Sequence, residues 1–261
     1  MKVTRFLWND QARWGIVVGD TICALEGKLW GSMNPGVTIC PLSEAKVLAP
    51  VEPGNKVVGL GLTYRDMYAR YEAREGKARR DGPAVFMKPP NTNVGHMDPI
   101  VYHEVCTGVI YEAEVGIVMG RRAARVSPDE ALEYVAGYTC VNDVTAAGFV
   151  TIERPIVSTR FKICDTFCPL GPVVETEVAD PAALTVLCRV NGREVERSTC
   201  GRDLIYTMGE CIAWVTSFMT LMPGDIIATG SNGTGRIEVG DMVEVEVEGI
   251  GVLRNPVVAP G

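Results

Sequence analysis

The sequence predicts a mainly β protein with a few helices, and three observations support this. Short apolar segments recur between turn-forming residues, and the 28 glycines and 16 prolines leave few stretches long enough for a helix. Apolar residues at helical spacing occur in only two or three stretches. The C-terminal residues 241–258 alternate valine with glutamate, as an antiparallel strand with one solvated face does. We therefore expect an architecture of many short strands.

The chain divides into a small N-terminal β domain, residues 1–50, and a main domain, residues 51–261. The first part alternates apolar segments, such as 15–19 and 21–25, with Gly and Pro turns, which is typical of strands joined by hairpins. At 261 residues, 47% of them hydrophobic, the chain is long enough to bury a full core.

The main domain begins with an apolar segment, residues 56–62, that is typical of a buried strand. The strongly charged residues 64–80 have helical character and precede an Asp-Gly-Pro turn. Residues 109–119 are apolar apart from two glutamates, which predicts one strand. A Ser-Pro-Asp-Glu capping box predicts a helix over 127–135. Residues 203–219 carry apolar side chains at helical spacing, which predicts another.

Composition and charge exclude several classes of protein. The 32 acidic residues outnumber the 25 basic ones, and no basic stripe is present, so we do not expect nucleic-acid binding. The start lacks a signal-peptide apolar region, and no run approaches the roughly 18 to 20 apolar residues that cross a membrane. The nine cysteines contain no CxxC pair and are typical of small buried side chains in a reducing compartment. We expect a cytoplasmic protein.

Three acidic residues are candidates for a metal site. In a strand over 109–119, Glu112 and Glu114 point to the same face. Two buried like charges are costly unless one is protonated or a cation lies between them, and Asp143, in an apolar segment, can supply a third oxygen. Such a set favours Mg²⁺, with Mn²⁺ or Ca²⁺ as alternatives, because no His or Cys cluster offers zinc ligands. The alternative is that these acids pair with nearby basic side chains or face solvent.

Several segments resemble the fumarylacetoacetate hydrolase family in order and spacing, and the resemblance extends from about residue 50 to 258. The segments that carry it are residues 111–115 (YEAEV), 134–145 (YVAGYTCVNDVT), 161–172 (FKICDTFCPLGP) and 218–230 (FMTLMPGDIIATG). The resemblance implies that Glu112, Glu114 and Asp143 are the metal ligands and that Lys162 is a catalytic or substrate-polarising amine. It also implies a mixed β-roll fold and a homodimer.

The family's substrates are small 2-oxo or β-dioxo acids. A cation chelated by the carboxylate and the neighbouring oxo or enolate oxygen acts as a Lewis acid. Such a Lewis acid assists hydrolytic C–C cleavage, decarboxylation and enol/keto isomerisation alike. The set of metal ligands therefore does not determine which of these reactions is catalysed. Lys162 beside the cation would have a lowered pKa or act as a fixed positive charge, and either favours an enolate.

The choice of reaction depends on the groups that move protons, and here the chain departs from the hydrolases. Their Asn-Tyr-x-x-His segment, whose His activates water, is matched by residues 63–67 (TYRDM), and Met67 cannot be a base. Tyr64 and Arg65 of this segment are candidate substrate contacts. Glu72 is a candidate acid or base, although an exposed helix face also explains it. The two histidines, His96 and His103, could replace the missing base or be structural.

Two loops also differ from the family pattern. The Thr-Ala-Arg-Asp that commonly follows the metal aspartate is here residues 145–148 (TAAG). The usual Gly-Thr-Pro-x-Gly loop is residues 230–235 (GSNGTG), in which Ser231 keeps a hydroxyl and the backbone from Gly230 onward offers N–H donors to a substrate carboxylate. A tight turn without a ligand is the alternative.

Residues 153–155 (ERP) and the C-terminal Arg-Asn-Pro-Val-Val are most similar to the decarboxylase/isomerase branch of homoprotocatechuate breakdown, which includes 2-hydroxyhepta-2,4-diene-1,7-dioate isomerase. Arg154 is a candidate for binding a distal substrate carboxylate. The leading hypothesis is metal-dependent decarboxylation or isomerisation of an unsaturated 2-oxo di- or tricarboxylate in aromatic catabolism. C–C hydrolysis of an acylpyruvate or a similar β-dioxo acid, and a catalytically silent metal-binding subunit, are the alternatives.

Overall fold

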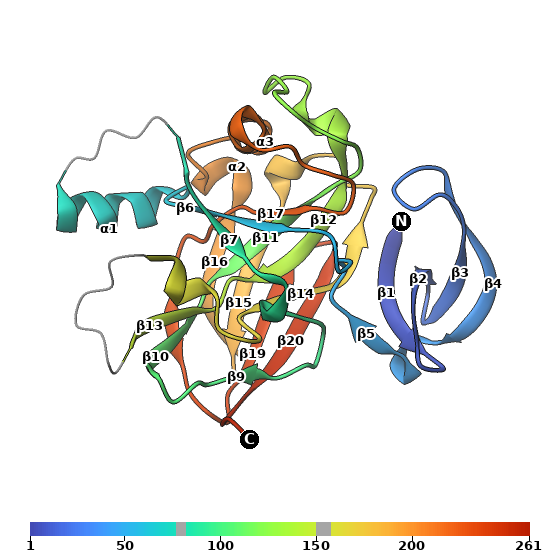
Figure 1. Cartoon of the computed structure of the whole chain (residues 1–261), viewed down its shortest axis with the longest axis horizontal. Helices are drawn as coiled ribbons and strands as arrows, with labels where there is room; N and C mark the ends of the chain where they lie inside the picture. Colours follow the sequence, from blue (N-terminus) through green and yellow to red (C-terminus); the bar gives the residue numbers. More distant parts are fainter. Residues whose placement is uncertain (77–81, 150–157) are drawn as a thin grey trace.

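The computed structural model describes residues 1–76, 82–149 and 158–261, and in these the predicted mainly β architecture is confirmed (Figure 1). Three sheets contain the strands. The largest comprises β1 (Lys2–Trp8), β2 (Gln11–Val18), β3 (Thr21–Gly27), β4 (Met33–Pro41), β5 (Lys46–Leu48), β6 (Val57–Gly61), β7 (Ala84–Lys88), β8 (Asn93–Val94), β11 (Ala113–Met119), β12 (Val135–Asn142), β14 (Cys168–Glu175) and β17 (Ile226–Ala228).

The two smaller sheets complete the main domain. One comprises β10 (Cys106–Tyr111), β13 (Thr145–Phe149) and β18 (Gly235–Ile237), and the other β9 (Ile100–Val101), β15 (Thr185–Val190), β16 (Arg193–Thr199), β19 (Met242–Val247) and β20 (Gly251–Val258). In β19 the valines are buried and the residues between them are partly exposed, as the Val/Glu alternation predicts. Apolar side chains from all three sheets meet in one large core cluster.

The N-terminal strands form consecutive hairpins on one side of the molecule (Figure 1). Asn9 and Asp10 both adopt positive φ in the first turn, which suits a tight hairpin. Strand β1 then pairs with β14, with Lys2 opposite Glu175, so the hairpins continue the large sheet of the main domain. The main domain and the first 50 residues therefore share backbone hydrogen bonds.

Helices are few among the described residues. The α-helices are α1 (Arg65–Glu75), α2 (Cys200–Asp203) and α3 (Met208–Phe218), and the 3₁₀ turns are η1 (Leu42–Glu44), η2 (Pro90–Thr92), η3 (Ala131–Tyr134), η4 (Ser158–Lys162) and η5 (Pro181–Ala183). Helix α1 projects from the body (Figure 1) and ends at Gly76, whose φ is 81°, earlier than the charged stretch predicted. None of these helices is long and apolar enough to cross a membrane.

Two predicted helices were wrong in their extent. Over 127–135 the structure has only the 3₁₀ turn η3, because the Ser127 hydroxyl donates to the Glu130 carboxylate, 2.8 Å away, and caps no backbone N–H. The helix predicted for 203–219 is interrupted before Met208. There Ile205 N donates to Thr63 O, and a capping box at Thr207 starts α3 anew.

The nine cysteines are all free thiols, and every one except the partly exposed Cys164 is buried. This confirms their interpretation as small core side chains.

Candidate active site

The three predicted metal ligands converge at the junction of two sheets. One carboxylate oxygen from each of Glu112, Glu114 and Asp143 lies within 4.8 Å of the others. Glu114 belongs to the central strand β11, Asp143 follows the adjacent strand β12, and Glu112 lies between β10 and β11. Glu114 and Asp143 are almost completely buried, and Glu112 is partly exposed.

Glu112 holds its place because the predicted single strand over 109–119 is broken there. Its N–H donates to the side chain of Asn142 at 3.1 Å, and its carbonyl accepts from Asp143 N at 2.9 Å. Because of these bonds, Glu112 belongs to neither β10 nor β11. At this residue the chain passes from the small sheet of β10 to the large sheet of β11. The one-strand prediction was wrong, but the break brings Glu112 beside Asp143.

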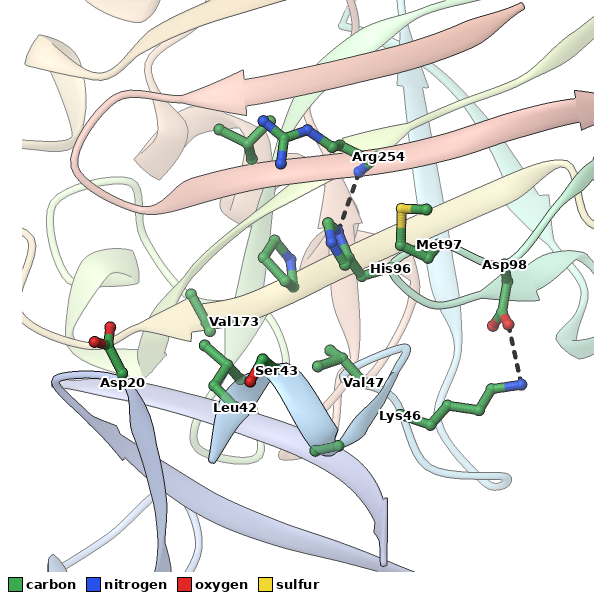
Figure 2. Close-up of a pocket in the computed structure, with 13 residues that line it drawn as sticks. Asp20, Leu42, Ser43, Lys46, Val47, His96, Met97, Asp98, Val173 and Arg254 are labelled. Carbon is green, nitrogen blue, oxygen red and sulfur yellow. Dashed lines mark hydrogen bonds and ion pairs between the residues drawn. The ribbon is translucent and has the colours of Figure 1, made fainter. Parts of the chain in front are cut away.

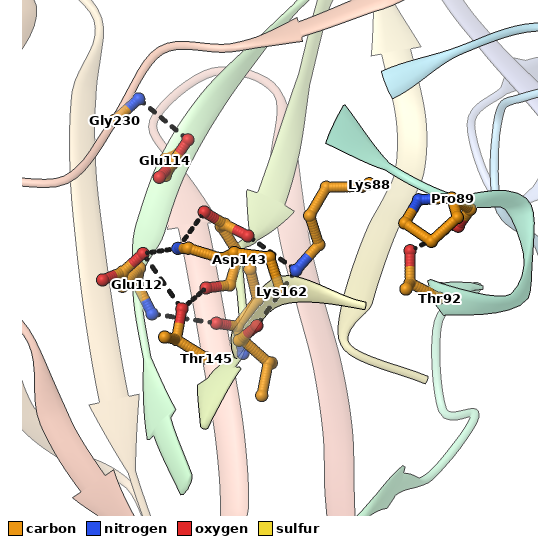
Figure 3. A network of polar contacts seen from close by, with 11 residues as sticks. Lys88, Pro89, Thr92, Glu112, Glu114, Asp143, Thr145, Lys162 and Gly230 are labelled. Atoms are coloured by element: carbon orange, nitrogen blue, oxygen red, sulfur yellow. Dashed lines mark hydrogen bonds and ion pairs between the residues drawn. The ribbon is translucent and has the colours of Figure 1, made fainter. Parts of the chain in front are cut away.

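Two lysines hold the acidic cluster (Figure 3). The Lys162 ammonium donates to Glu112 Oε2 and to Asp143 Oδ2, and it lies 4.7 Å from the centre of the Phe86 ring. The Lys88 ammonium, which is fully buried, lies 2.7 Å from Asp143 Oδ1 and donates to the carbonyl of Val144 at 3.0 Å. Asp143 is thus bound on both oxygens by cations.

The pKa values of the three acidic groups are shifted in different directions. Burial, followed by the Asp143 and Glu112 charges, raises the pKa of Glu114 well above its usual value, and burial also raises that of Glu112. Burial acts on Asp143 in the same direction, but Lys162 and Lys88 hold its pKa below the ordinary range. Burial would lower the pKa of Lys162, yet the Asp143 and Glu112 carboxylates raise it. Without a bound cation Lys162 is therefore a positive charge, and its predicted catalytic role stays a prediction.

The charges present suit a divalent cation. Three carboxylates meet two ammonium groups in a largely buried setting, so with all three ionised the carboxylates would exceed the ammonium groups by one negative charge. Glu114 accepts a hydrogen bond from an uncharged donor, the backbone N–H of Gly230, at 2.8 Å. An all-oxygen donor set of this kind fits Mg²⁺ or Mn²⁺ held by Glu112, Glu114 and Asp143.

The cluster opens into a cavity of about 550 Å³. Glu112, Glu114 and Lys162 line its polar end, and its apolar walls come mainly from Leu60, Leu62, Met67, Phe86, Ile110 and Phe161. Arg74 of α1 also lines it. Apolar walls lower the local dielectric constant, so the charges at the polar end act more strongly on anything bound there.

The glycine-rich loop lies beside this cavity, as predicted. Ser231 lines the cavity, and Gly230 positions Glu114 through its N–H. Gly230 has a φ of 89°, and a Cβ atom there would meet Thr63 Oγ1 at 2.0 Å, so the backbone requires glycine at this point.

Other predicted residues lie elsewhere. Tyr64 is buried with its hydroxyl 3.8 Å from Cys200 Sγ, and Arg65 is exposed and donates to Arg202 O. Neither these two nor Glu72 of α1 line the cavity, so their predicted roles stay predictions. Arg154 lies outside the described residues.

The histidines are also remote from the cavity lining. His96 Nδ1 accepts from Arg254 N at 3.2 Å, and His103 Nε2 lies 3.1 Å from Asp165 O. Neither lines the cavity, whereas Met67 does.

Sequence reasoning missed Lys88 and Arg74. A lysine followed by two prolines at the end of a short apolar segment looks like an ordinary strand end, and no local pattern shows that its ammonium is buried. Arg74 belongs to a run of alternating charges that is typical of a solvated helix.

Comparison with known proteins identifies the family of the chain. Residues 56–258 match the family model of the fumarylacetoacetate (FAA) hydrolase C-terminal domain, and residues 1–50 match a model described as Rv2993c-like, N-terminal. Human mitochondrial oxaloacetate tautomerase FAHD2B is 36% identical over 230 residues, which cover 84% of this chain and 72% of the relative.

Two solved structures are similar over their whole length. The 2-hydroxyhepta-2,4-diene-1,7-dioate isomerase of Mycobacterium marinum superposes with a TM-score of 0.87 at 33% identity, covering 100% of this chain and 99% of the other. The maleylpyruvate hydrolase of Sphingobium sp. SYK-6, in complex with manganese(II) and pyruvate, has a TM-score of 0.79 at 26% identity and full coverage of both chains. From its fold, its site and these matches, the chain belongs to the fumarylacetoacetate hydrolase family.

Proposed function

We propose that the protein is a divalent-metal-dependent enzyme that isomerises or decarboxylates an unsaturated 2-oxo di- or tricarboxylate through an enolate. The observation that carries this proposal is the position of Lys162: its ammonium is fixed by two carboxylates at the polar end of a cavity with apolar walls. Relatives with isomerase and tautomerase activity support the same class of reaction.

Glu112, Glu114 and Asp143 would hold Mg²⁺ or Mn²⁺, and the metal when bound would supply a Lewis acid for the 2-oxo acid. The relative bound to manganese(II) and pyruvate supports a 2-oxo acid as ligand. Lys162 lies at the polar end of the cavity, where its N–H groups would stabilise negative charge as the substrate becomes an enolate. The Ser231 hydroxyl can donate to a substrate oxygen.

Met67 favours a proton shift or loss of CO₂ over hydrolysis. The hydrolases that the sequence resembles use a histidine at this position to activate water, and here a thioether lines the cavity instead. Phe86 and Phe161 add aromatic surface to the same lining. An enolate formed in such a cavity is expected to be protonated on carbon.

The test is product analysis with oxaloacetate, an acylpyruvate and an unsaturated 2-oxo diacid, in Mg²⁺, Mn²⁺ or EDTA. Metal-dependent loss of the enol absorbance or release of CO₂ is the expected result. Pyruvate together with a free acid would establish C–C hydrolysis instead. If no substrate gives a metal-dependent product while Mn²⁺ still binds, the chain is a silent metal-binding subunit and the proposal is wrong.

A further inference from the structure

The glycine-rich loop, residues 230–235, is attached to the molecule at both ends. At one end Gly230 N donates to Glu114, and Ser231 lines the cavity. At the other, Gly233 N donates to Glu196 Oε1 at 2.7 Å. Between them the Asn232 side chain donates to Asp66 of α1 at 3.2 Å. A shift at the Glu196 end would therefore be transmitted over three residues to Glu114.

Glu196 lies on β16, outside the cavity and behind the loop. Its side chain is packed so closely that a Cβ atom on Gly233 would lie 3.2 Å from its Cδ. The second carboxylate oxygen, Oε2, is buried and has no hydrogen-bond partner among the described residues. A buried carboxylate oxygen without a hydrogen bond is costly, which indicates that the contact with the loop has a functional reason.

We infer that Glu196 is a positioning residue: its carboxylate fixes the backbone of the glycine-rich loop so that Gly230 N–H meets Glu114 and the Ser231 hydroxyl faces the cavity. This inference rests on the proposed function, because it assigns Glu196 an effect on metal and substrate binding. Glu196 itself touches neither, and it acts through the loop.

The electrostatic surroundings make this contact sensitive to pH. Burial raises the pKa of Glu196 to about 7; the N–H groups of Gly233 and Asn232 and the charge of Arg70 oppose the rise, while Glu112 adds to it. Tyr111 of β10 and Cys188 of β15 also face the carboxylate. The ionised form, present above about pH 7, is the stronger acceptor for the loop N–H groups.

Stability has the opposite dependence on pH. Because the pKa of Glu196 is raised above the ordinary 4.5, the folded protein binds this proton more tightly than the unfolded chain. Its contribution to stability is therefore greatest below 4.5 and declines as the pH rises through about 7. Replacing the carboxylate by an amide should relieve this cost and loosen the loop at the same time.

The test compares Glu196→Gln with Glu194→Gln at pH 8. Glu194 is on the same strand and carries the same charge, but it is exposed and pairs with Arg197. In Glu196→Gln we expect unchanged or higher thermal stability, about 10-fold weaker Mn²⁺ binding by calorimetry, a raised KM, and faster hydrogen exchange in the peptide 229–236. The control should match the wild type in all four.

In the wild type, the hydrogen-exchange rate of peptide 229–236, corrected for the intrinsic rate, should also decrease as the pH rises through 7. In Glu196→Gln this decrease should be absent. Unchanged Mn²⁺ affinity together with unchanged exchange in Glu196→Gln would overturn the inference. So would a joint loss of stability and affinity, since that would show a merely structural role. If the wild type binds no Mn²⁺, the proposed function fails, and hydrogen exchange alone then decides whether Glu196 holds the loop.

Discussion

Two of the hollows in this molecule differ in how their charged side chains are satisfied. The larger, about 1020 Å³, lies between the N-terminal strands and the main domain (Figure 2). In it Lys46, which is 58% exposed, pairs with Asp98 at 3.2 Å, and the Arg254 backbone binds His96. The smaller, about 550 Å³, contains the acidic cluster with Lys162 (Figure 3).

This difference shows that the volume of a hollow does not predict how its charged side chains are satisfied. The Lys46–Asp98 pair in the larger hollow is partly solvated, so it contributes little free energy. In the smaller hollow, Glu114 is almost completely buried and accepts a hydrogen bond from a backbone N–H, so a bound cation would compensate its charge. Four substitutions test this contrast.

The largest effect is expected for Glu114→Gln, which keeps the shape of a ligand but removes its charge. Outer neighbours of metal ligands change affinity by roughly 10- to 100-fold, so loss of a ligand should weaken Mn²⁺ binding by more than about 100-fold and turnover by about as much or more. Calorimetry and the enol assay measure both. Asp20→Asn, in the larger hollow, is the matched control and should bind Mn²⁺ normally.

The same variant should be more stable without metal. Because burial raises the pKa of Glu114 well above 4.5, the folded state binds this proton more tightly than the unfolded chain, and ionisation costs stability as the pH rises above 4.5. At pH 8 in EDTA, Glu114→Gln should therefore unfold at a higher temperature than the wild type. A lower melting temperature would contradict the view of Glu114 as an unpaired buried charge.

Lys162→Met should separate metal binding from turnover. It removes an ammonium that competes for Glu112 and Asp143, so Mn²⁺ affinity should increase, while kcat should fall by roughly 10²- to 10³-fold because the enolate loses a donor. Lys28→Met, at an exposed position, serves as the control. A variant that lost metal affinity and turnover together would assign Lys162 to holding the ligands instead.

Lys88→Met tests the buried ion pair on the other side of Asp143. Removing one partner of such a pair typically costs about 3 kcal/mol or more, and Lys162, which still binds Asp143, keeps the cost near that lower end. Denaturant unfolding at pH 7.5 measures it. Lys56→Met is a less suitable control because its ammonium also meets a buried carboxylate, so Lys28→Met is used again.

Acid unfolding gives a second readout for Lys88. The pKa of Asp143 is held below 3.8, so its contribution to stability is present above 3.8 and is lost as the pH falls through the lower, folded-state pKa. Without Lys88 that pKa rises, and acid unfolding should begin at a higher pH than in the wild type. Identical acid transitions would show that Lys162 alone sets the charge state of Asp143.

The sequence predicted which acidic residues converge better than it predicted the backbone around them. Glu112, Glu114 and Asp143 converge as the spacing and the family resemblance indicated. The strand break at Glu112 was missed because it depends on the side chain of Asn142, thirty residues away, and a two-residue period contains no information about such a partner.

Residues that act through distant contacts were the ones not predicted. Lys88 and Glu196 have ordinary local surroundings in the sequence, and the burial of the Lys88 ammonium and of the Glu196 oxygen Oε2 arises only when β7 and β16 pack into place. Helix ends were predicted poorly for a related reason. The Ser127 hydroxyl can bond either to a backbone N–H or to the Glu130 carboxylate, and the sequence does not determine which hydrogen bond forms.

The smallest effect is expected for Lys46→Met in the larger hollow. The Lys46–Asp98 pair is partly solvated, so its loss should cost at most about 1 kcal/mol. The difference from the wild type should disappear in 1 M NaCl, where the Debye length is about 3 Å. Mn²⁺ affinity and kcat should not change. A several-fold change in kcat would mean that the larger hollow is coupled to the acidic cluster and contributes to activity.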